Sequence, residues 1–142
     1  MIFYTRDLQT HVGIIDEQHQ EMINRINAVE AIRDESISGE EAEKILDFLG
    51  EYIIKHFGDE EELQIKSGYP EYAWHHELHR WYIAEYHRMR EEFFKNGATP
   101  EFTRLLDKSM MNWFVKHIIN VDVRLGKYIN QQKFKNNISA QK

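Results

Sequence analysis

Apolar side chains recur every three or four positions over most of the chain, which is the pattern of α-helices that bury one face. The first 15 residues lack this period and are expected to form an arm laid along the domain. No stretch shows the alternation of apolar and polar residues that is typical of a strand. The pattern predicts four helices, over about residues 16–32, 39–67, 71–94 and 100–122.

Capping residues mark where several of these helices begin. Asp16 is placed to cap the first helix, and Ser38 with Glu41 three residues later fits a capping box for the second. Thr99 and Pro100 supply a cap and a first-turn proline for the fourth. Because the connections are short, consecutive helices must be neighbours that run in opposite directions. We therefore expect an all-α fold, an antiparallel up-down-up-down four-helix bundle with an N-terminal arm.

The chain beyond the fourth helix is expected to add little to the core. A short further helix or a tail follows, over about residues 123–132. Residues 133–142 are mostly polar, and we expect them to form a flexible tail. The sequence thus predicts one bundle domain over residues 1–132 and a tail over residues 133–142.

Composition and charge exclude several classes of protein. The chain contains no cysteine, so disulfides, thiolate zinc sites and cysteine-held iron–sulfur clusters are ruled out. Its formal net charge of -6 argues against a nucleic-acid or anionic-membrane partner. The sequence has neither a long apolar run nor a basic start followed by an apolar core, so we expect no export or membrane insertion. These features predict a cytoplasmic protein. We expect a monomer, with an oligomer as the alternative.

Histidines and carboxylates interrupt the apolar stripes of all four predicted helices. Residues four positions apart on a helix share a face, so pairs of them can reach a common point. One histidine in a core stripe is more often a hydrogen-bonded core residue than a metal ligand. Seven buried polar groups would each cost about 1–3 kcal/mol if unpaired, so here a metal is the better explanation. The seven candidates are His19, His56, Glu60, His75, His79, His117 and Asp122.

Seven ligand side chains are too many for one ion, because a first-row metal takes about four to six ligands. Two irons bridged by Glu60 and Asp122 could share all seven and leave one position free. The five-residue step from His117 to Asp122 turns an ideal helix by about 140°. These two side chains can therefore reach one centre only if the helix relaxes or they approach from different sides. Five polar residues off the stripes are assigned to the surface, namely His11, His76, His87, Glu61 and Glu62.

Two other metal-binding classes fit the sequence less well. Ferritin-like oxidases and iron stores use the same bundle but need Glu-x-x-His pairs, and this chain has none. A zinc protease needs His-Glu-x-x-His, and the segment from His76 to Arg80 misses that spacing by one residue.

Four motifs in a fixed order carry a resemblance to a known family. They are Asp16-Glu17-Gln18-His19, His56-Phe57-Gly58-Asp59-Glu60-Glu61, His75-His76-Glu77-Leu78-His79, and the stretch from Trp113 to Asp122. With these motifs, roughly residues 12–125 resemble the hemerythrins, and specifically the single-domain bacterial hemerythrins. Each motif alone is weak, but the ordered combination is highly specific.

The resemblance implies a non-haem di-iron centre that binds dioxygen reversibly, for oxygen storage, delivery or scavenging, and not an enzyme. It implies that one iron is held by His75, His79 and His117. The other iron, which keeps an open position, would be held by His19 and His56. Both irons would be bridged by Glu60, Asp122 and an oxo or hydroxo group.

Apolar side chains that neighbour the ligands in helical phase are expected to wall the open position. These are Met22, Phe57, Trp113, Phe114 and Ile118. Nitric oxide or a small anion such as azide could occupy the same position. The alternative function is a sensor of oxygen, nitric oxide or redox state that signals to a partner protein.

Overall fold

Helices make up nearly all of the chain that the computed structural model describes, which comprises residues 1–33 and 37–140, with side chains up to residue 136. The first three long helices are α1 (Gly13–Ala28), α2 (Gly39–Ser67) and α3 (Tyr72–Asn96). A last rod is built of α4 (Pro100–Arg104), the π-helical η3 (Leu105–Asn112), α5 (Trp113–His117), the π-helical η4 (Ile118–Asp122) and α6 (Val123–Ala140). The short segments η1 (Arg6–Leu8) and η2 (Val29–Ile32) are 3-10 helices.

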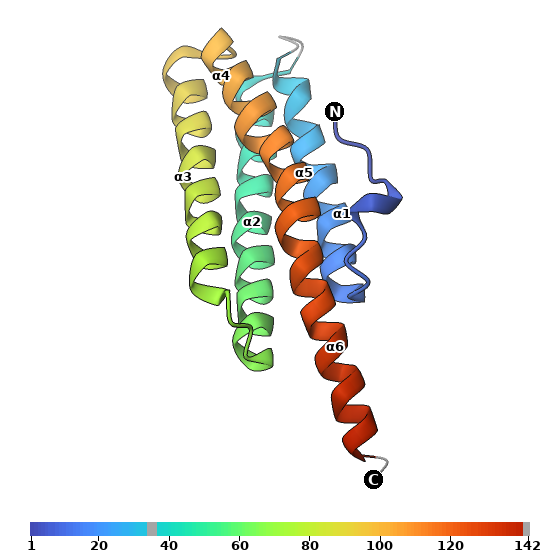
Figure 1. The fold of residues 1–142 in the computed structure, drawn as a ribbon. Helices are drawn as coiled ribbons and strands as arrows, with labels where there is room; N and C mark the ends of the chain where they lie inside the picture. The colour runs from blue at the N-terminus through green and yellow to red at the C-terminus, as the bar shows by residue number, and fades with distance from the viewer. Residues whose placement is uncertain (34–36, 141–142) are drawn as a thin grey trace.

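The helices α1, α2, α3 and the last rod lie side by side and alternate in direction (Figure 1). Packing contacts join α1 to α2, α2 to α3, and α3 to η3. Residues 1–33 and 37–140 contain no strand, and the predicted all-α four-helix bundle is confirmed. No helix in this part of the chain combines the length and the apolar character that a membrane crossing requires.

Most of the predicted helix boundaries are found where the capping residues place them. Ser38 Oγ accepts a hydrogen bond from the Glu41 amide at 3.1 Å, and α2 begins at the next residue, Gly39. Thr99 Oγ1 accepts one from the Phe102 amide at 3.1 Å, ahead of Pro100. These side chains satisfy amides that the first turn of a helix leaves unpaired. The predicted break between the first two helices falls partly on residues 34–36, which lie outside the described residues.

The predicted role of Asp16 as a helix cap is wrong. The helix α1 already begins at Gly13, so Asp16 lies in its first turn. Its carboxylate accepts hydrogen bonds from the Thr10 amide at 2.8 Å, the Thr10 hydroxyl at 2.7 Å and the His11 amide at 3.1 Å. An acidic side chain at a helix N-terminus is favourable for the helix dipole as well. Asp16 therefore fastens the N-terminal arm to α1.

The apolar side chains gather in two clusters along the length of the bundle. The larger one includes Met22, Phe57 and Ile118, all at most 1% exposed. The smaller one comprises Val12, Ile15, Tyr69, Leu125 and Ile129. Along α1 the predicted ligand His19 lies between the two clusters, and along the last rod Asp122 does. The fold thus places a polar layer between two apolar layers.

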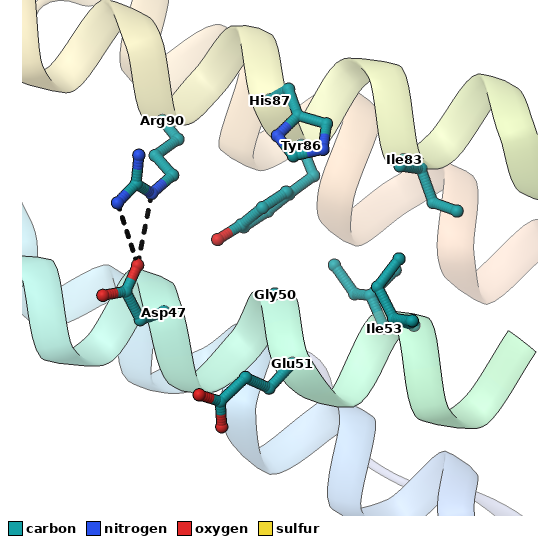
Figure 2. Close-up of a pocket in the computed structure, with 9 residues that line it drawn as sticks. Asp47, Gly50, Glu51, Ile53, Ile83, Tyr86, His87 and Arg90 are labelled. Atoms are coloured by element: carbon teal, nitrogen blue, oxygen red, sulfur yellow. Dashed lines mark hydrogen bonds and ion pairs between the residues drawn. The ribbon is translucent and has the colours of Figure 1, made fainter.

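Tyr86 of α3 fixes the distance between α3 and α2 on one side of the bundle. Its hydroxyl donates a hydrogen bond to the Leu46 carbonyl at 2.5 Å, and Arg90 pairs with Asp47 at 3.0 Å (Figure 2). A Cβ on Gly50 would collide with the Tyr86 ring. Glycine at this position therefore lets α2 and α3 pack closely, with the ring of Tyr86 between them.

The helix α6 continues through Ala140 and projects beyond the other helices (Figure 1). It is longer than the helix of about residues 123–132 that the sequence indicated. Residues 133–140, which were expected to form a flexible tail, are helical. These residues contain neither glycine nor proline, so nothing ends a helix that is already formed. The division into a domain over residues 1–132 and a tail over residues 133–142 stays a prediction.

The arm packs against α6 at Gly126. A Cβ there would collide with the Thr10 carbonyl, and Asn130 donates a hydrogen bond to the His11 carbonyl at 3.2 Å. We expect Gly126→Ala to lower the free energy of unfolding by about 1–3 kcal/mol, because the arm must move to admit the methyl group. Denaturant unfolding followed by circular dichroism measures this. The control is Gly58→Ala, where nothing lies within 4 Å of the added Cβ.

The control variant should be stabilised by about 0.5–1 kcal/mol, because alanine is the better helix former. Equal stabilisation in Gly126→Ala would show that the arm does not rest on α6.

Candidate metal centre

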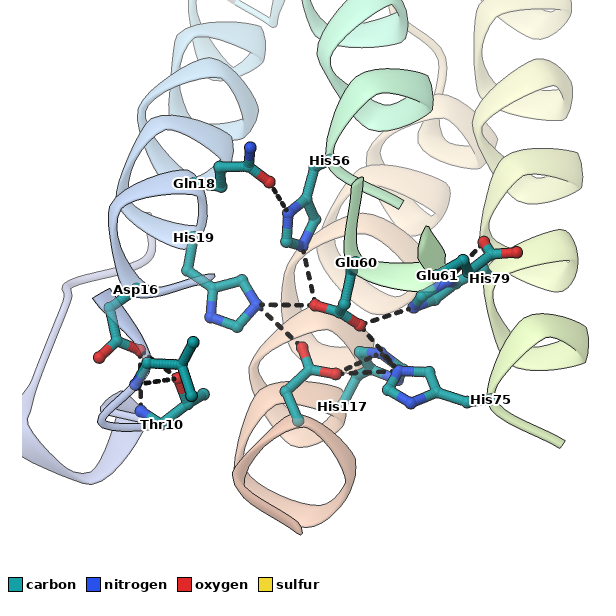
Figure 3. Close-up of polar contacts among 12 residues, drawn as sticks. Thr10, Asp16, Gln18, His19, His56, Glu60, Glu61, His75, His79 and His117 are labelled. Carbon is teal, nitrogen blue, oxygen red and sulfur yellow. Dashed lines mark hydrogen bonds and ion pairs between the residues drawn. The ribbon is translucent and has the colours of Figure 1, made fainter. Parts of the chain in front are cut away.

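All seven predicted ligand residues meet in the centre of the bundle (Figure 3). They come from α1, α2, α3, α5 and η4, so each of the four long helical rods contributes at least one. Every one of them is at most 3% exposed. The seven are His19, His56, Glu60, His75, His79, His117 and Asp122.

The ligand atoms fall into two groups, within each of which all the atoms lie within 4.8 Å of one another. One group has three histidines, His75, His79 and His117. The other has two, His19 and His56. Glu60 and Asp122 belong to both groups.

Each carboxylate directs one oxygen to each group. Glu60 Oε1 lies 2.9 Å from His75 Nε2 and 3.3 Å from His79 Nε2. Its other oxygen, Oε2, lies 3.5 Å from His56 Nε2 and 3.8 Å from His19 Nε2. A carboxylate split in this way between two sets of imidazoles has the arrangement of a bridge between two ions.

Asp122 is split in the same way. Its Oδ1 lies 3.0 Å from His75 Nε2 and 3.1 Å from His117 Nε2, whereas its Oδ2 lies 2.9 Å from His19 Nε2. The two carboxylates thus lie side by side between the two groups of histidines.

The π-helical segment η4 explains how His117 and Asp122 reach one centre. A π-helix closes its hydrogen bonds between residues five apart, so a five-residue step returns the chain to the same face. The segment η4 spans Ile118–Asp122, directly after His117. The helix is therefore relaxed where the sequence required it to be.

Burial and charge oppose each other in this centre. Burial disfavours the charged form of His75, but the carboxylates of Asp122 and Glu60 close to its ring outweigh burial and raise the pKa of His75 to about 9. Burial lowers the pKa of His56 to about 3. Burial and the charge of Asp122 favour protonation of Glu60, yet the histidines around it keep its pKa below the usual range. A cation would replace a proton as the positive charge that these carboxylates need.

The donor atoms fit a bound metal better than a network of hydrogen bonds. The histidine nitrogens and carboxylate oxygens approach one another closely, but several of them form no hydrogen bond of acceptable geometry in the described part of the chain. These are the Nε2 atoms of His19, His56 and His79 and both oxygens of Glu60 and of Asp122. Buried polar atoms without partners are costly, and a cation would satisfy all of them. Imidazole nitrogens with carboxylate oxygens suit first-row transition metals.

Gln18 orients one of the candidate ligands. Its side-chain oxygen lies 2.9 Å from His56 Nδ1, and its amide nitrogen donates to Asp59 at 2.9 Å. Lys55 contacts the same carboxylate at 3.0 Å. If Nδ1 carries the proton, the Nε2 lone pair of His56 is directed at the centre.

Glu61 orients another ligand, and its assignment to the solvated surface is wrong. Its carboxylate lies 3.0 Å from His79 Nδ1 and also contacts His76 Nδ1. His76, which was also assigned to the surface, is partly exposed and contacts this carboxylate, but it is not among the candidate ligands. Glu61 follows Glu60, so it faces about 100° away, toward α3. A polar residue directly next to a ligand was the signal that could have revealed both Glu61 and Gln18.

Four of the five residues expected to wall the open position are buried, and Trp113 is partly exposed. The Phe57 ring stacks on His79 with ring centres 3.8 Å apart and also lies near His56. Phe114 meets His19 edge-on at 5.8 Å. Trp113 stacks on His117, which belongs to the three-histidine group. The role of these residues in ligand binding stays a prediction.

Comparison with known proteins agrees with this geometry. A model of the "Hemerythrin HHE cation binding domain" matches residues 10–123. A bacteriohemerythrin of Methylococcus capsulatus is 28% identical over 128 residues, which cover 89% of this chain and 94% of the relative. One of Stenotrophomonas maltophilia is 27% identical over 121 residues, covering 83% and 74% of the two chains. One of Pseudomonas aeruginosa is 29% identical over 119 residues, covering 82% and 73%.

The family model spans most of the chain and includes every residue of the buried centre. The resemblance that the four motifs indicated is thereby confirmed, and this chain belongs to the family of hemerythrin HHE cation-binding domains.

Proposed function

We propose that this protein holds two iron ions at the seven buried residues and binds dioxygen reversibly at one of the two irons. The observation that carries the proposal is the split of Glu60 and Asp122, each of which directs one oxygen to each group of histidines. Two carboxylates placed in this way would bridge two ions, together with an oxo or hydroxo group from solvent. Membership of a cation-binding family supports it, and the choice of iron follows from that family.

The two halves of the centre would differ in how many positions the protein fills. The half with His75, His79 and His117 offers three imidazoles and two carboxylate oxygens. The half with His19 and His56 offers one imidazole fewer, so a small ligand would bind there. Iron bound there in the ferrous form would supply the electrons with which dioxygen is held. Nitric oxide or azide would compete for the same position.

The protein's own residues would keep the centre reactive toward a small neutral gas. Imidazoles are neutral ligands, so a histidine-rich set leaves more positive charge on the ions than a carboxylate-rich set does. Gln18 and Glu61 would hold two of the rings in place through their Nδ1 atoms. Met22, Phe114 and Ile118 are fully buried and would exclude water and protons, which slows oxidation of the centre to an inactive ferric form.

Metal analysis and one spectrum test the proposal. Purified protein should contain two irons per chain, and the reduced protein exposed to air should show a visible charge-transfer band that disappears under vacuum. Met22→Glu offers a carboxylate to the open position and should keep iron but lose this band. The control is Glu62→Gln on the exposed side of α2. One metal ion per chain, or zinc, would refute the di-iron proposal.

Glu61→Gln should weaken retention of iron by about tenfold to a hundredfold, because the carboxylate that orients His79 is lost while the ligand stays. Competition with a coloured chelator measures the change. Glu62→Gln is the matched control, since Glu62 is exposed and pairs with Lys66 at 2.8 Å. Equal affinity in the two variants would show that Glu61 does not act on the metal.

A further inference from the structure

Aromatic rings connect the centre to the protein surface in a continuous stack. Trp113 lies on His117 with ring centres 4.6 Å apart and planes 14° apart. Trp81 of α3 is a further neighbour of Trp113, with ring centres 5.2 Å apart and planes tilted by 35°. Trp81 is 44% exposed, whereas His117 is only 3% exposed. The two indole rings therefore lead from a candidate ligand, through the partly exposed Trp113, to the more exposed Trp81 on α3.

Tyr82 and Trp74, two other aromatic residues of α3, do not extend this stack to the surface. Tyr82 also stacks on Trp113, at 5.1 Å, but it is fully buried and its hydroxyl donates to the Met110 carbonyl. Trp74 is 46% exposed, but the contact of its ring is with the guanidinium of Arg124, 5.7 Å away. Trp81 is thus the exposed end of the stack, and Trp74 is an exposed tryptophan of the same helix outside it.

We propose that Trp81 and Trp113 form an electron-transfer route, by which a one-electron donor at the surface of α3 reduces ferric iron at His117. The proposal rests on the proposed di-iron function. Each transfer oxidises the donor by one electron and reduces one Fe(III) to Fe(II), so two donor molecules restore the centre. No covalent bond forms or breaks, and the indoles neither gain nor lose a proton overall.

Because the centre is buried, an electron donor at the surface cannot contact the irons directly and needs a route through the protein. All seven candidate ligands are at most 3% exposed, so a donor larger than the gas cannot touch the irons. Electron transfer weakens steeply with distance, and contact between π systems shortens the gap that the electron must cross. A protein that binds dioxygen at ferrous iron needs such reduction whenever the centre is oxidised to the ferric form.

Reduction by a bulky donor tests the route. Oxidised, iron-loaded protein is mixed without oxygen with reduced methyl viologen, and loss of the ferric absorption is followed by stopped flow. Trp81→Leu should slow the reduction by about tenfold, equivalent to ~1.4 kcal/mol in activation free energy. Trp81→Phe should restore most of the rate because an aromatic ring returns to the stack. Trp74→Leu should leave the rate unchanged.

Iron content and the midpoint potential are measured for each variant before mixing. Both should equal those of the original protein, which shows that Trp81→Leu changes the rate and not the centre. Equal rates in Trp81→Leu and Trp74→Leu would overturn the proposal, as would a slower rate explained by a shifted potential. Absence of iron from the original protein would instead overturn the proposed function, and this route with it.

Discussion

Glu60→Ala should leave the protein with little or no iron, because it removes one of the two carboxylates that contact both groups of histidines. Loss of one histidine should be less severe. We expect His56→Ala to lose mainly the iron of the two-histidine half and His117→Ala mainly that of the other half. Iron per chain, measured by emission spectrometry after desalting, should be near zero in Glu60→Ala and about half of the original amount in the two histidine variants.

The matched control for this comparison is Glu62→Ala, two residues along the same helix and exposed. It should retain the full amount of iron. If Glu60→Ala kept one iron per chain, the carboxylate would belong to one half only and would not be a bridge.

Removal of iron should lower the melting temperature by about 10 °C. A ligand present at about a thousand times its Kd stabilises the folded state by ~4 kcal/mol, and in a protein of this size each kcal/mol raises the melting temperature by about 2–4 °C. The loss has a structural cause, since the buried nitrogens and carboxylate oxygens of the centre lose their partner. The metal-free protein should still fold, because the two apolar clusters lie on either side of the centre.

Differential scanning calorimetry before and after treatment with a chelator measures this shift. Glu60→Ala serves as the control, since a variant that holds no iron has none to lose and the chelator should not change its melting temperature. A chelator effect of equal size in both proteins would mean that iron does not stabilise the fold.

The sequence was sufficient to predict the helices and the seven residues that the structure brings together, because both follow from positions along single helices. His56 with Glu60 and His75 with His79 share a face whatever the neighbouring helices do. The π-helical turn after His117 was not predicted, since local winding does not show in the hydrophobic pattern. Its only sign in the sequence is the five-residue step from His117 to Asp122, which an ideal α-helix cannot accommodate.

Contacts between helices were harder to predict. Whether Glu61 meets solvent or His79 depends on how α2 is rotated against α3, and the hydrophobic period specifies that rotation only within a broad stripe. Asp16 was misread for a similar reason, because its three hydrogen bonds run to an arm that has no period of its own. The length of α6 does not follow from the sequence, because polar composition is compatible with an exposed helix as well as with a flexible tail.

The π-helical turn η4 makes the number of residues in the last rod as important as their identity. Each residue turns a helix by about 100°, so deleting one between His117 and Asp122 would rotate everything that follows. Leu125 and Ile129 would leave the cluster that they form with the start of α1, and Gly126 would no longer face the arm. The position of Asp122 in the metal centre and the contact of Gly126 with the arm therefore depend on the same helical register. Between His117 and Gly126, a change in the number of residues would therefore disturb both contacts, whereas a substitution would leave the register unchanged.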